Sequence, residues 1–124
     1  MIQVSNKIKR YMKLAKKISL LSCLRFKVGA VLVRNNIILA TAENLRKTHP
    51  RFGSGPYYSL HAEGHVIWKA IRKNIEITNS TIYVYRSNGG LAKPCKYCQD
   101  ILKEFNIKAI YSNGTKEEFS CMDK

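Results

Sequence analysis

The chain opens with apolar residues that recur at helical spacing. The stripe contains Val4, Ile8, Tyr11, Ala15 and Ile18. Lysines occupy many of the positions between them, which is the pattern of an amphipathic helix that buries one face. We therefore predict a helix over residues 3–22.

Short apolar runs further along the chain predict strands. Val28–Val33 and Ile37–Ala42 flank Arg34-Asn35-Asn36, and asparagine tolerates the positive φ of a tight hairpin turn. Thr81–Tyr85 and Ile107–Tyr111 are rich in β-branched and aromatic residues, as strands are. The sequence thus predicts one hairpin followed by two separate strands.

Two later segments return to helical spacing, and they complete the predicted order of elements. They are His61–Lys73 and Cys95–Phe105, and the prolines and glycines of residues 43–60 predict a loop before the first of them. Strands that flank such helices are expected to be parallel, with right-handed crossings. We predict the α/β class: a three-layer α/β/α sandwich with a mixed four- or five-stranded sheet. The weakly patterned tail, Thr115–Lys124, leaves little room for a full fifth strand.

Length and composition favour one soluble domain. With 124 residues, of which 45% are hydrophobic, residues 1–124 fit a single domain that can bury its own core. The apolar stretch Ile18–Leu24 is too short and too interrupted to span a bilayer or to serve as a signal peptide. We expect a protein that is cytoplasmic or otherwise intracellular and not secreted, with no membrane partner.

The net charge of +14 leaves two interpretations open. Residues 1–42 contain no acidic residue, and such a surface attracts polyanions, so nucleic acid is a candidate partner. A codon bias toward Lys, Ile and Asn accounts for the same excess without any partner.

The residues that carry chemistry are His61-Ala62-Glu63 and Pro94-Cys95-Lys96-Tyr97-Cys98. Zinc favours imidazole and thiolate ligands, and two cysteines three positions apart at a helix start can reach one ion. Three protein ligands, His61, Cys95 and Cys98, leave a fourth position open for water, as in catalytic zinc sites. Glu63 is then placed to move protons, and Pro94 suits the first helical position.

A structural zinc site is the competing interpretation, and it would need a fourth ligand. The candidates are His49, His65, Cys23 and Cys121. His65 is the best of them, because it shares the helix face of His61. Glu63 argues against this alternative, since a structural site has no use for a carboxylate beside the metal.

These motifs resemble the cytidine/deoxycytidylate deaminase superfamily of zinc-dependent nucleobase deaminases. The resemblance runs from about Val28 to Tyr111 and includes the first strand and the order of elements. It implies a cytidine deaminase-like fold and hydrolysis of an exocyclic amine by a zinc-activated water, with Glu63 as proton shuttle. It also implies that Asn44 contacts the substrate, that backbone groups of Ala62 and Pro94 hold the ring, and that the protein is a homo-oligomer.

The substrate remains open at this level. The small domain favours a cytosine-type base in a free (deoxy)nucleoside or nucleotide such as deoxycytidylate. The charge, and the stacking that Tyr57 and Tyr58 could provide, favour cytosine or adenine within single-stranded DNA or RNA, including tRNA; the same tyrosines could instead pack on the core. A non-catalytic zinc-containing nucleic-acid-binding module is a further alternative. Arg51, Arg86 and Lys93 are candidates to hold a phosphate, although most loop cations have no such role.

Overall fold

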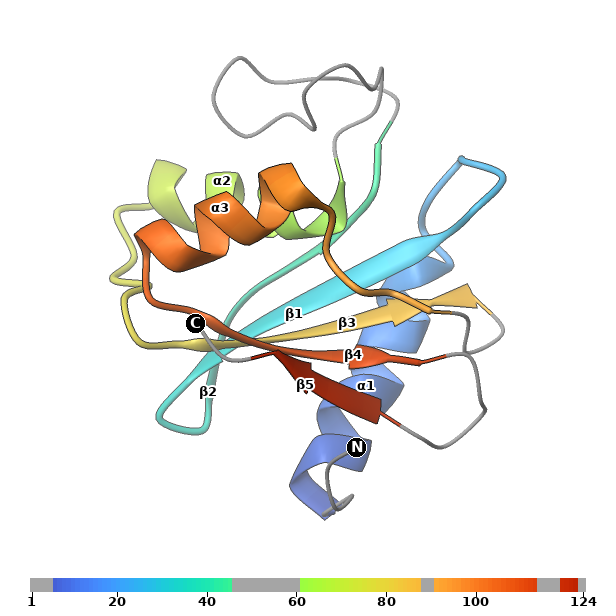
Figure 1. Cartoon of the computed structure of the whole chain (residues 1–124), viewed down its shortest axis with the longest axis horizontal. Coiled ribbons are helices and arrows are strands. Elements are labelled where there is room, and N and C mark those ends of the chain that lie inside the picture. Colours follow the sequence, from blue (N-terminus) through green and yellow to red (C-terminus); the bar gives the residue numbers. More distant parts are fainter. Residues whose placement is uncertain (1–5, 46–60, 88–90, 114–118, 123–124) are drawn as a thin grey trace.

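The computed structural model describes residues 6–45, 61–87, 91–113 and 119–122, the last of these as backbone only. Within these ranges the elements follow the predicted order, with one additional strand at the end (Figure 1). They are α1 (Asn6–Ser19), β1 (Val28–Arg34), β2 (Ile37–Glu43), α2 (Ala62–Arg72), β3 (Thr81–Arg86), α3 (Lys96–Glu104), β4 (Lys108–Ser112) and β5 (Phe119–Met122).

The strands form one mixed sheet in the order β2-β1-β3-β4-β5. β1 runs antiparallel to both β2 and β3, so β2 and β3 share a direction, and β3 pairs parallel with β4. Both strand–helix–strand connections therefore join strands of the same direction, as the sequence predicts. The turn between β1 and β2 has positive φ at Asn35 (52°) and Asn36 (63°), which confirms the predicted hairpin.

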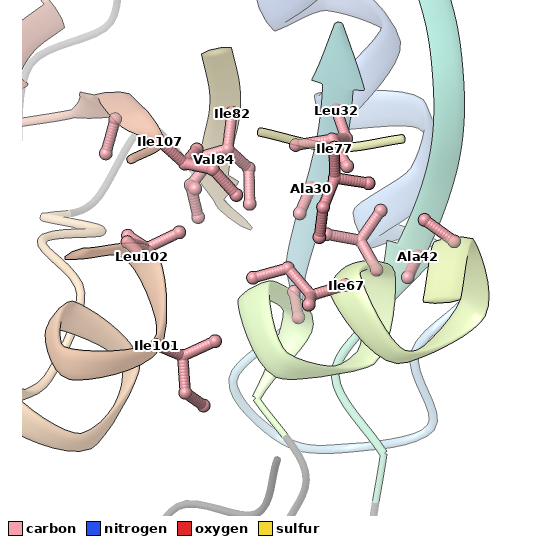
Figure 2. Close-up of a cluster of buried hydrophobic side chains, with 14 of the residues drawn as sticks. Ala30, Leu32, Ala42, Ile67, Ile77, Ile82, Val84, Ile101, Leu102 and Ile107 are labelled. Atoms are coloured by element: carbon pink, nitrogen blue, oxygen red, sulfur yellow. The ribbon is translucent and has the colours of Figure 1, made fainter. Parts of the chain in front are cut away.

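The sheet carries helices on both faces, which confirms the predicted three-layer architecture. Figure 1 shows α2 and α3 side by side on one face and α1 on the other. Side chains that alternate along the strands serve the two faces in turn. Leu32, Ile82 and Val84 pack toward α2 and α3 (Figure 2), whereas Val31 and Tyr83 pack against α1.

α1 approaches the sheet most closely at Gly29. A Cβ atom at this position would lie 2.2 Å from the Ala15 carbonyl oxygen and 2.5 Å from the Ser19 nitrogen. Only hydrogen fits in such a gap, so the glycine sets the distance at which Tyr11, Met12 and Ala15 are buried against β1 and β3.

The end of α1 differs from the prediction. α1 ends at Ser19, not at residue 22, because the next turns tighten into i→i−3 bonds, with Leu21 N–H donating to Ile18 and Ser22 N–H to Ser19. The Ser22 hydroxyl then donates to the carbonyl of Asn44, a tertiary contact that sequence periodicity does not reveal.

The tail forms a fifth strand despite its weak pattern. β5 has four residues and pairs antiparallel with β4, from Ser112↔Phe119 to Ala109↔Met122. The room was sufficient for a short strand, in agreement with the upper value of the four or five strands predicted. Among the described residues, no helix combines the length and apolar character needed to cross a bilayer.

Candidate metal centre and active site

The N-termini of α2 and α3 bring the predicted metal ligands together. His61 is the N-cap residue of α2 (φ −67°, ψ 155°), and Cys95 is the N-cap residue of α3 (φ −70°, ψ 171°). Neither side chain makes a capping hydrogen bond to its own helix. Cys98 lies one turn into α3 and is fully buried. Because Cys95 occupies the N-cap, the first helical position belongs to Lys96, and the prediction that Pro94 fills it is wrong by two positions.

The geometry of the three side chains fits a tetrahedral ion. The Nδ1 atom of His61 lies 3.5 Å from the sulfur of Cys95 and 3.5 Å from that of Cys98. Zinc bonds of the usual lengths at a tetrahedral angle place nitrogen and sulfur about 3.6 Å apart. All three ligand atoms fall within 4.8 Å of one another, and they form the one such group found in the described part of the chain. Both cysteines are free thiols.

Electrostatics at this cluster favour the ligating form of Cys95. A hydrogen bond from the Cys98 thiol, together with one from the His61 imidazole, lowers the pKa of Cys95 to about 4. The same contact with Cys95 raises the pKa of His61 against the opposing effect of burial. A thiolate beside a helix N-terminus is the state in which cysteine binds a metal.

Glu63 projects from the first turn of α2 and is only 5% exposed. Burial raises the pKa of its carboxyl group, while the nearby His61 opposes that rise. The carboxyl group is thus held next to the ligand cluster in surroundings that weaken its preference for the charged form, as suits a group that exchanges protons.

A cavity of about 540 Å³ opens beside the cluster. His61, Ala62, Glu63 and Cys95 form part of its lining, so the ligand atoms and the carboxylate are accessible to a ligand from one space. The remaining lining comes from the connection before β1, from the start of β1, from the residue after β2, from the end of β3 and from the segment before α3. These residues are Leu24, Arg25, Phe26, Val28, Asn44, Arg86, Leu91, Ala92 and Lys93.

Asn44, the predicted substrate contact, lies in the lining of this cavity, and its side chain also serves the fold. Its Oδ1 accepts from the N–H of Val28 at 2.9 Å, and its Nδ2 donates to the carbonyl of Phe26 at 2.7 Å. The amide therefore clamps the chain segment that leads from α1 into β1. Pro94 is buried and does not line the cavity, and its carbonyl accepts from Nε2 of Gln99 at 2.8 Å.

His65 is not a fourth metal ligand in the described structure. Its Nδ1–H donates to the carbonyl of Glu43 at 2.6 Å, and burial lowers its pKa, so the ring is neutral near pH 7. Cys23 is exposed and belongs to no metal-ligand group of the described residues. His49, Arg51, Tyr57 and Tyr58 lie outside the described residues, as does the side chain of Cys121.

The cavity also contains residues that the sequence did not single out. Leu24, Arg25 and Phe26 belong to the connection between α1 and β1, to which the sequence analysis assigned no function. Arg86 and Lys93, two of the predicted candidates to hold a phosphate, also line the cavity. Within the limits of the described chain, the site combines a His–Cys–Cys group, a buried carboxylate and a cationic lining, and the first two are features of a catalytic zinc site.

Comparison with known proteins identifies the family. Residues 5–113 match the model of the cytidine and deoxycytidylate deaminase zinc-binding region. The dCMP deaminase of cyanophage S-TIM5 is 29% identical, with a TM-score of 0.69 over 92% of this chain and 88% of that one. Its structure in complex with dCMP and dUMP gives 26% identity and a TM-score of 0.66 over 88% and 83%.

Other solved structures share the fold at lower identity. Cytidine deaminase from Burkholderia pseudomallei is 18% identical, with a TM-score of 0.73 over 97% of this chain and 93% of that one. At this identity the likeness concerns the fold alone. A comparison with curated protein sequences gave no match.

The chain belongs to the cytidine and deoxycytidylate deaminase family, which confirms the resemblance drawn from its motifs. It is a zinc-dependent enzyme of this deaminase type, and its His–Cys–Cys group is positioned to bind the metal ion.

Proposed function

We propose that the protein removes the exocyclic amine of a cytosine-type base in a free (deoxy)nucleoside or nucleotide such as deoxycytidylate. The observation that carries this proposal is the meeting of His61, Cys95, Cys98 and buried Glu63 at one cavity. The cavity volume of about 540 Å³ lies in the range of roughly 300–1,000 Å³ that is usual for small-molecule sites. The S-TIM5 enzyme binds dCMP and dUMP, which differ by the exchange of an amine for an oxygen.

In this proposal the metal ligands are His61, Cys95 and Cys98. Zinc, when bound, supplies a Lewis acid that makes water a better nucleophile at neutral pH. Glu63 accepts a proton from the attacking water as its oxygen bonds to the ring carbon that bears the amine. Glu63 then delivers that proton to the departing nitrogen as the carbon–nitrogen bond breaks, so that ammonia leaves. The remaining hydroxyl proton passes to the neighbouring ring nitrogen, which leaves a carbonyl.

The substrate contacts follow the family resemblance. Backbone groups of Ala62 and of the stretch around Pro94 and Cys95 hold the ring; Ala62 and Cys95 line the cavity, whereas Pro94 only precedes Cys95 in the chain. The Asn44 amide keeps one N–H and one lone pair beyond its two backbone bonds, and it contacts the sugar or base. Tyr58 precedes α2 in the chain and is assigned to the substrate because its ring can stack on a base. Residues 1–124 form one deaminase domain in this proposal, and the protein assembles as a homo-oligomer.

The test is ammonia release by zinc-loaded protein from cytidine, deoxycytidine and their monophosphates. Glu63→Gln keeps the shape of the side chain and removes its proton transfer, so we expect the rate to fall about 10²- to 10⁴-fold with zinc content unchanged. Glu76→Gln is the matched control, because Glu76 is exposed and does not line the cavity. An active Glu63→Gln variant would remove Glu63 from the mechanism.

Single-stranded DNA and RNA belong in the same assay because the net charge is +14. Release from polymers alone, weakening as salt rises, would replace the free nucleotide by a polynucleotide substrate. Wild-type protein that releases ammonia from none of these compounds would contradict the proposal and favour the non-catalytic module.

A further inference from the structure

A second cavity, of about 280 Å³, lies at the opposite end of the sheet from the metal centre. The active-site cavity includes Val28 at the start of β1 and Arg86 at the end of β3, whereas this one includes Arg34 at the end of β1 and Thr81 at the start of β3. Its lining comes from the start of α1, from the turn between β1 and β2, and from the start of β3. The two cavities share no described residue.

The lining of this second cavity is polar and positively charged. Lys7 and Arg34 contribute cations, the asparagines of the β1–β2 turn contribute amide groups, and no acidic residue of the described chain lines the cavity. Neither cation forms a salt bridge within the described ranges. Hydrogen bonds with Thr78, and more weakly the charge of Arg34, lower the pKa of Glu76, but this exposed carboxylate lies outside the lining. The cationic charge is therefore available to a ligand.

Tyr83 gives the cavity a buried hydroxyl group that lacks a partner. Only 3% of this residue is exposed, and its hydroxyl makes no hydrogen bond to another residue in the part of the chain that the structure describes. The neighbouring Tyr11, whose ring centroid is 5.0 Å away, already accepts from Arg10 at 3.0 Å and donates to the Asn36 carbonyl at 3.5 Å. Buried hydroxyl groups are nearly always hydrogen-bonded, so an acceptor inside the cavity is the partner that Tyr83 needs.

Arg10 adds a third positive charge behind this wall. Its guanidinium carbon lies 4.9 Å from the centroid of the Tyr11 ring, which holds the group beside the tyrosine pair. Burial and Tyr11 raise the pKa of Tyr83, whereas the charge of Arg10 lowers it, so Arg10 is within electrostatic reach of the Tyr83 hydroxyl.

From this arrangement we infer that the cavity between α1, the β1–β2 turn and the start of β3 binds a small oxyanion of the phosphate type. The oxygen atoms of such an anion accept charge-assisted hydrogen bonds from the Lys7 ammonium and the Arg34 guanidinium, and a further bond from the Tyr83 hydroxyl. The volume of about 280 Å³ is below the roughly 300–1,000 Å³ of pockets that hold drug-sized molecules, which favours a free anion over a whole nucleotide. This site goes beyond the proposed function and does not depend on it.

The experiment follows the backbone amide signals of ¹⁵N-labelled, zinc-loaded protein by nuclear magnetic resonance. Inorganic phosphate replaces chloride at constant ionic strength, so that general screening of the surface charge stays fixed. We expect the signals of Asn35, Asn36 and Thr81 to shift along a saturable curve. Phosphate that enters the active-site cavity is observed separately, through the signal of Ala62.

Two variants remove single groups from the proposed site. Arg34→Gln and Tyr83→Phe should each weaken the binding seen at Asn35, Asn36 and Thr81 about 10-fold or more, as the loss of one hydrogen bond to a charged group does. Lys9→Gln is the matched control, because Lys9 is an exposed cation of α1 outside the lining, and it should bind phosphate as wild type does. Lys7→Gln changes an exposed side chain and keeps the test decisive if a buried change prevents folding.

Three results would overturn the inference. The first is the absence of saturable shifts at the three residues, even in a protein that deaminates its substrate. The second is a set of shifts along α1 that persists in all of the lining variants, because diffuse attraction to the basic surface would then explain them. The third is a response to oligothymidylate without a response to inorganic phosphate, which would assign this surface to a polynucleotide.

Discussion

Replacing Asn44 with alanine tests how the active-site wall is held in place. The residue is 7% exposed, and its side chain bridges two backbone groups of the segment that leads into β1. Alanine removes both hydrogen bonds, to the N–H of Val28 at 2.9 Å and to the carbonyl of Phe26 at 2.7 Å. The substitution also changes the lining of the active-site cavity, to which Asn44 contributes.

The expected cost follows from these two bonds. Each contributes about 1 kcal/mol net, and leaving the Val28 N–H without its acceptor adds about 1 kcal/mol or more. The total of about 3 kcal/mol corresponds to a fall in Tm of about 11 °C for a chain of 124 residues. Asn44→Asp retains an oxygen for Val28 but sets a carboxylate against the Phe26 carbonyl, so its loss should be intermediate.

Thermal and urea unfolding of zinc-loaded protein, followed by circular dichroism, measures both variants. Catalytic efficiency is measured alongside, well below the Tm of the weaker variant. A loss below about 1 kcal/mol for Asn44→Ala would refute the clamp, because one hydrogen bond alone should cost that much. A loss of activity without a loss of stability would assign Asn44 to the substrate rather than to the wall.

Three other changes test the fold and the metal centre. Gly29→Ala should lower the free energy of unfolding by roughly 1–3 kcal/mol or more in urea, because its Cβ would lie 2.2 Å from the backbone of α1. Gly29→Val should lower it further. Equal stability of wild type and Gly29→Ala would contradict the close approach. Burial raises the pKa of Tyr83, so the unfolded chain releases this proton first and stability should fall as pH rises through about 10. Tyr83→Phe should lose less stability over that interval in denaturant titrations, and an identical decline in both proteins would exclude Tyr83 as its source. Cys98→Ser should leave the purified protein with little zinc by mass spectrometry while its far-ultraviolet spectrum persists; a full complement of zinc would remove Cys98 from the ligand set.

Local periodicity predicted most of the elements because each one repeats a simple pattern. The hairpin at Asn35 and Asn36 and both later helices were predicted to within a residue or two, since apolar spacing and cap residues are properties of neighbouring positions. The predictions differed where a partner distant in sequence decides the outcome. Ser22 lies beyond the end of α1, and its hydroxyl donates to the Asn44 carbonyl. β5 forms because the edge of β4 accepts a short strand.

In the candidate site, too, the residues with a local sequence pattern were predicted and those brought in by tertiary contacts were not. His61, Glu63, Cys95 and Cys98 were predicted from spacing, because zinc chemistry restricts residue type and separation so tightly. The contribution of Arg25 and Phe26 was not predicted, since an Arg-Phe pair between two elements has no distinctive pattern.

The sequence by itself determined the order of elements, the ligand set and the family, because each depends on residue types at fixed separations along the chain. Tertiary structure alone decided which side chains share the cavity. Arg25 and Arg86 lie 61 positions apart, and they meet on Phe26 only because β1 pairs antiparallel with β3, with Val28 opposite Arg86. Strand register is set by the packing of the whole sheet, and so the charge at the mouth of the active site is a property of the fold.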